Sequence, residues 1–177
     1  ITRTQDIFDQ FANKHIVLTG GRGFLGRYLT EIFFKYNKIL NKPIKLTVID
    51  NLAVSSELGR IWPNYNNFKF IKSDASKKLH LENDVDFIVH AAGIASPFYY
   101  RSKPLETLDV AVNGLRNVLN SASENNAKVI FFSSSEIYGD PDPRFVPIKE
   151  TYRGNVNTMG PRACYDEGKR LGETLCY

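Results

Sequence analysis

The sequence predicts a doubly wound parallel α/β sheet with helices on both faces. Short apolar runs alternate along the chain with longer segments in which apolar residues recur at helical spacing, and no repeat or low-complexity tract interrupts this order. The chain has 177 residues, of which 42% are hydrophobic, and Gly and Pro are scattered through it. These values suit one globular domain of ordinary size, over residues 1–177.

The predicted strands are apolar runs that end in small or polar residues. Near-continuous apolar runs are typical of parallel strands that are buried on both faces. The runs are HIVLTG (15–20), KLTVID (45–50), FKFIKSD (68–74), DFIVHAAG (86–93) and KVIFFSSS (128–135). His90 lies inside the fourth run, and we therefore expect a structural histidine there and not a catalytic one.

Three segments have the pattern of helices that pack on this sheet. The first is a possible short helix before the first strand, the second follows that strand, and the third lies between the fourth and fifth strands as one apolar stripe. Their apolar positions are Ile7, Phe8 and Phe11, then Leu25, Leu29, Ile32 and Phe33, and finally Leu108, Val112, Leu115 and Leu119.

Charge and cysteine content exclude several classes of protein. Lys and Arg exceed Asp and Glu by four, but they are spread along the chain, which makes a nucleic-acid stripe a weak hypothesis. No run approaches the ~20 apolar residues of a membrane span, and no signal-peptide pattern opens the chain. Cys164 and Cys176 lack metal-ligand or disulfide spacing, so we expect no metal, two free thiols and a reducing cytoplasm.

The stretch TGGRGFLG places Gly20, Gly23 and Gly26 between the first strand and the following helix. A pyrophosphate can approach a turn without Cβ atoms, and the helix start offers free N–H donors and the positive end of its dipole. In this context we favour a Rossmann-type dinucleotide site over a simple tight turn. Phe24 and Leu25, in the same turn, are assigned to the cofactor as well.

Polar and small residues end the next strands at the same edge of the sheet. Asp50 ends the second strand, where a carboxylate can bind the adenosine ribose hydroxyls and would repel a 2′-phosphate, so NAD is favoured over NADP. Asn51 follows it. Asp74-Ala75 and Ala91-Ala92-Gly93 end the third and fourth strands. Each could be a turn residue, but together they predict one cofactor groove.

The stretch GPRACYDEGKR carries a tyrosine and a lysine four residues apart. Pro161 suits the first turn of a helix, so Tyr165 and Lys169 should project from the same side. A lysine ammonium stabilises a nearby phenolate, which makes the tyrosine a usable base beside a nicotinamide. A lone pair of this spacing would more often be exposed surface, but SSSEIYGD also places Ser134 and Glu136 at the end of the fifth strand.

In this order TGGRGFLG, HAAG, SSSEIYGD and YDEGK resemble the extended short-chain dehydrogenase/reductases that modify nucleotide sugars. Within that family, GPRACYDEGKR and ASPFYYRSKPLETL are similar to the UDP-glucuronate decarboxylases. The resemblance implies that Tyr165 is the base, that Lys169 holds the ribose and that Ser134 and Glu136 belong to the active site. It also implies that Ser96 and Tyr100 face the sugar acid.

The resemblance further implies a cycle in which NAD oxidises carbon 4 of a UDP-sugar, carbon dioxide leaves and the hydride returns. The rivals are a 4,6-dehydratase, which usually has Asp where this chain has Ser135, and a 4-epimerase. A non-catalytic NAD-binding module is the alternative from another class. Relatives place the sugar nucleotide in a smaller domain after this helix, so we expect that domain to be missing here, the isolated chain to be inactive and the enzyme to be a homodimer.

Three positions depart from the family pattern. Ala111 stands where an asparagine is usual, Val54-Ser55-Ser56 replaces a usual Gly-Arg after the second strand, and Arg27 occupies a place that is often small. These changes concern the cofactor contacts more than the fold.

Overall fold

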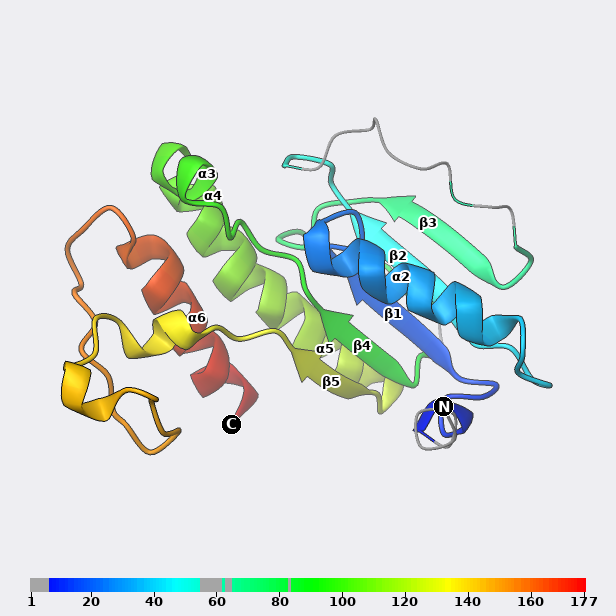
Figure 1. Cartoon of the computed structure of the whole chain (residues 1–177). Helices are drawn as coiled ribbons and strands as arrows, with labels where there is room; N and C mark the ends of the chain where they lie inside the picture. Colours follow the sequence, from blue (N-terminus) through cyan, green and yellow to red (C-terminus); the bar gives the residue numbers. More distant parts are fainter. Residues whose placement is uncertain (1–6, 55–61, 63–64, 83) are drawn as a thin grey trace.

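The computed structural model describes residues 7–54, 62, 65–82 and 84–177, and it has a five-stranded parallel sheet (Figure 1). The strand order is β3-β2-β1-β4-β5, as in a doubly wound fold. The strands are β1 (His15–Thr19), β2 (Lys45–Asp50), β3 (Phe68–Lys72), β4 (Phe87–His90) and β5 (Lys128–Phe131). All five predicted runs form strands. Four of them end earlier than predicted, because their last residues leave the ladder for loops at the carboxyl edge.

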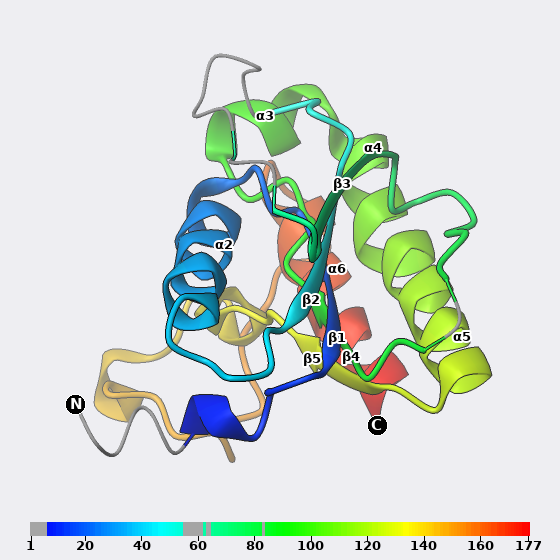
Figure 2. The same cartoon turned by 90° about the vertical axis from the view of Figure 1, so that its right-hand side faces the viewer.

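Helices cover both faces of the sheet, as predicted. Figure 2 shows α2 on one side of the sheet and α4 with α5 on the other. The helical elements are α2 (Phe24–Asn37), α3 (Pro97–Ser102), α4 (Pro104–Asp109), the π-helix η1 (Val110–Gly114), α5 (Leu115–Asn125), the 3-10 turns η2 (Ser135–Tyr138) and η3 (Pro143–Phe145), and α6 (Ala163–Cys176). Within the described residues, no helix is long and apolar enough to cross a membrane.

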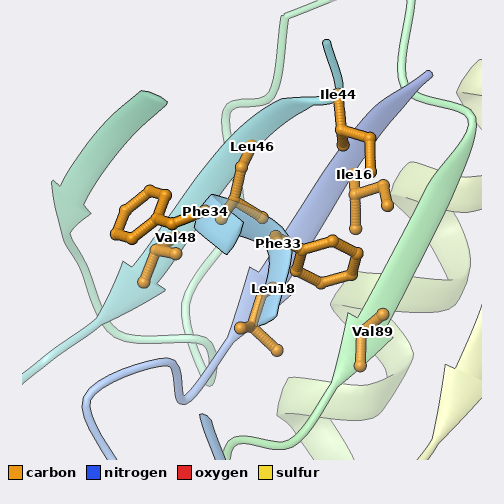
Figure 3. Close-up of a cluster of buried hydrophobic side chains, with 8 residues drawn as sticks. All are labelled: Ile16, Leu18, Phe33, Phe34, Ile44, Leu46, Val48 and Val89. Atoms are coloured by element: carbon orange, nitrogen blue, oxygen red, sulfur yellow. The ribbon is translucent and has the colours of Figure 1, made fainter. Parts of the chain in front are cut away.

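Alternate residues of β1 fill the two cores. Ile16 and Leu18 pack toward α2 with Phe33 (Figure 3), and Val17 packs on the opposite face with the α5 cluster. All three β1 side chains are at most 1% exposed. Slipping this strand by one residue would exchange its two faces, so burial on both sides fixes the register. The register in turn fixes which loops meet at the carboxyl edge.

The long helical segment after β4 differs from the single stripe predicted for it. Of the four predicted positions only Leu115 is fully buried, and the face on the sheet continues through Val118 and Ala122. The π-helix η1 separates α4 from α5. A π-turn has more residues than an α-turn. The side chains of α4 therefore point in a different direction from the apolar stripe of α5. The residues of α4 therefore pack on α6 as well.

The segment before β1 packs on the domain, as predicted. Residues 7–9 form a helical turn. The ring of Phe8 stacks on Tyr36 at the end of α2, with 3.6 Å between centroids, and Phe11 lies edge-on to Phe87 in β4 at 5.1 Å. Aromatic pairs of this kind stabilise the fold by more than the burial of their apolar surface alone.

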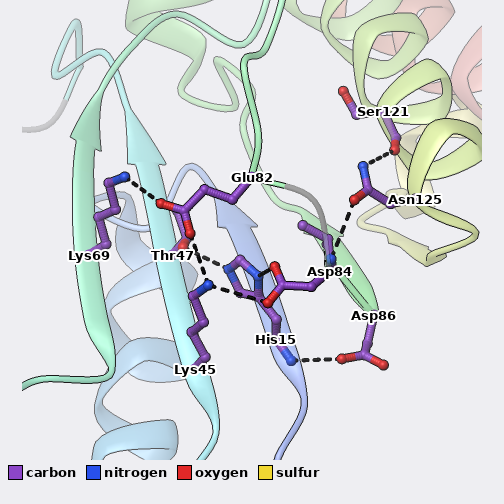
Figure 4. A network of polar contacts seen from close by, with 10 residues as sticks. His15, Lys45, Thr47, Lys69, Glu82, Asp84, Asp86, Ser121 and Asn125 are labelled. Atoms are coloured by element: carbon purple, nitrogen blue, oxygen red, sulfur yellow. Dashed lines mark hydrogen bonds and ion pairs between the residues drawn. The ribbon is translucent and has the colours of Figure 1, made fainter.

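A polar network ties the loop before β4 to the amino ends of β1, β2 and β3 (Figure 4). The buried His15 places Nδ1 3.1 Å from Asp84 Oδ1 and Nε2 2.9 Å from Thr47 Oγ1. Glu82 accepts hydrogen bonds from Lys69 and Lys45, which lower the pKa of the Glu82 carboxyl to about 2. This network lies at the sheet edge opposite the glycine turn.

Candidate active site

The glycine turn after β1 leaves no room for side chains. Gly20 has a φ of +74°, and a Cβ on it would lie 2.6 Å from the backbone nitrogen of Ala92. A Cβ on Gly26 would lie 2.2 Å from the carbonyl oxygen of Gly20. Helix α2 begins at once at Phe24, and no side chain caps its first turn. Its first N–H groups are therefore left for a ligand, and they fit a pyrophosphate.

A groove of about 1030 Å³ follows the carboxyl edge of the sheet. Most of the residues that the sequence assigns to the cofactor line it. They are Gly20, Gly23, Phe24, Asp50, Asn51, Asp74, Ala75, Ala91, Ala92 and Gly93, and Ser96 lines it as well. Gly26 is buried beneath the turn, and Leu25 lies outside the lining with 52% of its surface exposed. These two residues shape the turn and do not form the groove wall.

Backbone donors hold Asp50 rigidly at the groove. Its Oδ2 accepts the N–H of Arg22 at 2.9 Å, and its Oδ1 accepts the N–H of Leu52 at 2.8 Å. A carboxylate oxygen can accept more than one hydrogen bond. The carboxylate therefore fits the ribose of a dinucleotide, and its charge opposes a phosphate there.

Asp74 is the second anion on the groove wall. Burial alone would raise its pKa, but the N–H and hydroxyl of Ser76, the Asn51 side chain and the charge of Lys77 together hold the pKa below its usual range. Its Oδ1 accepts the Ser76 N–H at 2.9 Å. Asp74 is therefore an ionised acceptor at neutral pH, next to Asn51.

Several groove residues are absent from the sequence predictions. The guanidinium of Arg22, inside the glycine turn, lies 4.5 Å from the centroid of Trp62, and both line the groove. Lys103, Glu106 and Asp109 line it as well. Their three-residue spacing in the sequence could have indicated that they share one polar face of a helix. Trp62 lies in a loop, where no periodicity marks it.

Tyr165 and Lys169 lie on one side of α6, as predicted, although α6 begins at Ala163, two residues after Pro161. The Lys169 Nζ is 5.9 Å from the Tyr165 ring centroid and donates a hydrogen bond to the Phe132 carbonyl at 2.5 Å. A Cβ placed on Gly93 would be 3.9 Å from the same Nζ. The ammonium thus links the tyrosine to the end of the groove that Gly93 lines.

Burial sets the charge state of Lys169. It lowers the pKa of the ammonium from the ordinary 10.5 to about 8. The group stays mostly protonated at neutral pH. A cation with little water around it interacts strongly with a nearby phenolate or hydroxyl, because the local dielectric constant is low. Lys169 can therefore stabilise an ionised Tyr165 and donate to a ligand in the groove.

Tyr100, which the resemblance places next to the sugar acid, is buried beside Tyr165. Its side chain is 3% exposed, and its ring stacks on Tyr165 with 5.4 Å between centroids and 15° between planes. Its carbonyl accepts a hydrogen bond from the Cys164 thiol at 3.6 Å. Ser96 lines the groove, whereas Tyr100 is not part of its lining. Tyr100 supports the ring of Tyr165.

Ser134 and Glu136 lie together after β5. Ser134 caps the turn η2, and its Oγ accepts the Glu136 N–H at 3.3 Å. The Glu136 carboxylate forms an ion pair with Arg162, which immediately precedes α6. Glu136 belongs to η2, which contacts the helix that carries Tyr165, and Ser134 immediately precedes η2. None of Ser134, Glu136, Tyr165 and Lys169 lines the groove itself.

His90 and the cysteines have the surroundings of structural groups. The buried His90 places Nδ1 2.7 Å from Thr19 Oγ1, and burial, helped by the charge of Lys169, lowers its pKa to about 4. The imidazole is therefore neutral at physiological pH. Cys164 and Cys176 are both free, as predicted.

The three departures from the family pattern lie in different surroundings. A Cβ on Gly168 of α6 would lie 2.9 Å from the Cβ of Ala111, so η1 and α6 approach closely at this position. Arg27 lines the groove and donates through Nε to the Arg22 carbonyl at 2.8 Å. Val54 also lines the groove, whereas Ser55 and Ser56 lie outside the described residues.

This geometry defines a class of protein. A parallel sheet with a glycine turn after β1, an acid at the end of β2 and a Tyr-Lys pair near the groove is a Rossmann-type dinucleotide-binding domain. The chain belongs to the NAD dependent epimerase/dehydratase family, whose model matches residues 16–177. This confirms the family resemblance found in the sequence.

Similar proteins agree with this membership. The chain is 41% identical over 165 residues to UDP-glucuronic acid decarboxylase 1 of Danio rerio, and 38% identical over 167 residues to UDP-glucuronic acid decarboxylase 6 of Arabidopsis thaliana. The alignments cover 93% and 94% of this chain but 37% and 46% of those relatives.

Among solved structures, a UDP-N-acetylglucosamine 4-epimerase from Methanobrevibacter ruminantium M1, in complex with UDP-N-acetylmuramic acid, is similar. Its TM-score is 0.74 at 27% identity, and the match covers 93% of this chain and 50% of that one. The NAD dependent NDP-hexosamine 5,6-dehydratase TunA matches with a TM-score of 0.69 at 25% identity, over 92% of this chain and 50% of that one.

Proposed function

We propose that this protein is an NAD-dependent enzyme that decarboxylates UDP-glucuronate. The observation that carries the proposal is the position of Lys169, whose ammonium lies between the Tyr165 ring and the Gly93 end of the glycine-lined groove. A protein that only bound a dinucleotide would need the groove but not this pair. The names of the relatives at 41% and 38% identity support the choice of reaction and substrate.

NAD would lie along the groove. The N–H groups at the start of α2 would hold its pyrophosphate, and Asp50 would accept the hydroxyls of the adenosine ribose. Lys169, at the far end, would hold the nicotinamide ribose. When bound, NAD would supply an acceptor for the hydride of sugar carbon 4 and later return that hydride.

Tyr165 would act as the base and acid. As a phenolate stabilised by Lys169 it takes the proton of the sugar 4-hydroxyl, and as a phenol it returns a proton to the same oxygen when the ketone is reduced. Stacking on the buried Tyr100 restrains the position of the Tyr165 ring. Ser134, close to the turn that holds Glu136, would donate a hydrogen bond to the oxygen at carbon 4.

The 4-ketone would make decarboxylation possible. A carboxylate on carbon 5 is then β to a ketone, so the carbon–carbon bond breaks, carbon dioxide leaves and its electron pair passes to the ketone oxygen as an enolate. Hydrogen bonds from Tyr165 and Ser134 would stabilise that oxygen. Carbon 5 would then take up a proton from solvent, and return of the hydride to carbon 4 would give the UDP-pentose. Ser96, on the groove wall, would contact the sugar.

Product mass separates this reaction from its rivals. The full-length protein is incubated with NAD and UDP-glucuronate, and with UDP-glucose and dTDP-glucose in parallel, and the products are analysed by mass spectrometry. We expect loss of carbon dioxide from UDP-glucuronate alone. Loss of water from a hexose would identify a dehydratase. A product of unchanged mass that chromatography separates from the substrate would identify a 4-epimerase. The absence of a product with every sugar would favour a non-catalytic NAD-binding module.

We also propose that the enzyme is a homodimer whose interface is formed by helices that include α6. Leu171 of α6 is 42% exposed on this helix, which is consistent with an interface there. Sedimentation of the wild type and of Leu171→Glu tests this. A dimer that becomes monomeric in the variant is expected, and a monomeric wild type would contradict it.

The cytoplasm is the proposed location. Two unpaired cysteines, one of them exposed, suit a reducing compartment. Cell fractionation with an antibody against the protein checks this, and recovery from an oxidising compartment would contradict it.

A further inference from the structure

Arg162, in the motif that carries Tyr165, contacts two carboxylates at once. Its Nη2 forms an ion pair with Oε2 of Glu136, on the turn after β5. Its Nε lies 3.6 Å from Oδ2 of Asp166, one turn further along α6. The guanidinium of Arg162 therefore interacts with two carboxylates, one on η2 and one on α6.

Asp166 needs a positive neighbour more than Glu136 does. Its side chain is only 10% exposed, and its Oδ1 is buried with no hydrogen-bond partner in the described part of the chain. A buried carboxylate is costly unless it is paired. Glu136, with a side chain 35% exposed, could turn toward water if Arg162 were absent. Asp166 therefore anchors the guanidinium, and the guanidinium restrains Glu136.

The backbone of Arg162 is fixed as well. Its carbonyl accepts the N–H of Tyr165 at 2.9 Å and the N–H of Asp166 at 3.1 Å, in the first turn of α6. Arg162, which holds Glu136, is thus also hydrogen-bonded through its backbone to Tyr165. A displacement of Glu136 relative to Tyr165 would have to break the ion pair.

We propose that Arg162 is a positioning residue that holds Glu136 at a fixed place relative to Tyr165, and that Asp166 keeps the Arg162 guanidinium in position. The inference rests on the proposed function, because Glu136 has a task only if the site performs chemistry. The competing possibility is that Arg162 only neutralises Asp166 and so has a purely structural task.

Two pairs of variants of the full-length protein separate these possibilities. Arg162→Ala removes the guanidinium, and Arg162→Ala with Asp166→Asn removes the orphaned charge as well. Glu136→Gln alone and combined with Arg162→Ala completes a double-mutant cycle. Arg162→Lys tests rescue, and Arg116→Ala, at an exposed position of α5, is the matched control. The readouts are kcat and KM for UDP-glucuronate, the NAD dissociation constant and the melting temperature.

Positioning through Glu136 predicts a fall in kcat of at least about tenfold in Arg162→Ala, since a displaced acid or base loses part of a contribution that is typically ~10²–10⁴-fold. The KM and the NAD affinity should change by less than about threefold, and Arg162→Lys should recover part of kcat. Asp166→Asn should restore the melting temperature of Arg162→Ala but not its kcat. In the Glu136→Gln background the loss of Arg162 should cost less than about threefold.

Other outcomes overturn the inference. If the Asp166→Asn change restores both melting temperature and kcat, Arg162 is only a counter-charge. If the kcat losses of Arg162→Ala and Glu136→Gln multiply, the arginine does not act through the glutamate. An inactive wild type with intact NAD binding would instead refute the proposed function, which the wild-type rate distinguishes from both results.

Discussion

Burial of the Lys169 ammonium makes the stability of the protein depend on pH in a defined window. The pKa is about 8 in the folded protein and near the ordinary 10.5 in the unfolded chain. Below about pH 8 both states are protonated, and the folded state carries the full cost of burying the charge. Between the two values the unfolded chain binds more protons, so stability rises with pH. The rise should reach about 2 kcal/mol between about pH 7 and about pH 9.5.

Urea unfolding followed by circular dichroism measures this effect. Wild type and Lys169→Met are unfolded at several pH values across this range, and the difference between their free energies of unfolding is plotted against pH. His90, whose pKa of about 4 depends partly on Lys169, is neutral across this range, so the difference isolates Lys169. Lys128→Met, at an exposed position that begins β5, is the control and should run parallel to the wild type. A Lys169→Met difference that stays constant within about 0.5 kcal/mol would refute the assigned burial.

Two further substitutions test the groove. Gly26→Ala would place a Cβ 2.2 Å from the Gly20 carbonyl oxygen, so we expect about 1–3 kcal/mol of destabilisation and weaker NAD binding, measured by thermal unfolding and titration. Gly160→Ala, with its nearest neighbour 4.0 Å away, is the control, and equal behaviour of the two variants would contradict the packing. Asp50→Asn removes a charged acceptor, so NAD affinity should fall about tenfold while NADP affinity falls less or rises. Titrations in which the affinities for NAD and NADP fall by the same factor would refute this role of Asp50.

The sheet and the glycine turn could be predicted because their signals are local. The run around Val17 is apolar without interruption, since a parallel strand is buried on both faces, and a turn as tight as that at Gly20 admits glycine alone. The shared side of Tyr165 and Lys169 likewise follows from helical spacing. Such features depend on a few neighbouring residues, which the sequence displays directly.

Features that depend on two elements could not be predicted in the same way. The π-turn before Leu115 lies where the helical segment contacts α6, whereas periodicity alone indicated one continuous helix. The stacking of Tyr100 on Tyr165 joins two helices, and no spacing rule predicts it. The pairing of Arg162 with Glu136 joins residues far apart in the sequence, and no spacing rule connects them.

The most direct test of the central claim is single-turnover formation of reduced nicotinamide by Tyr165. Full-length wild type and Tyr165→Phe are saturated with NAD, mixed rapidly with UDP-glucuronate and followed by the absorbance of the reduced ring. The wild type should show a transient that rises and then decays, and the variant should form it at least about 10²-fold more slowly with nearly unchanged NAD affinity. A transient of equal rate in both proteins would contradict the claim that the Tyr165–Lys169 pair performs the chemistry.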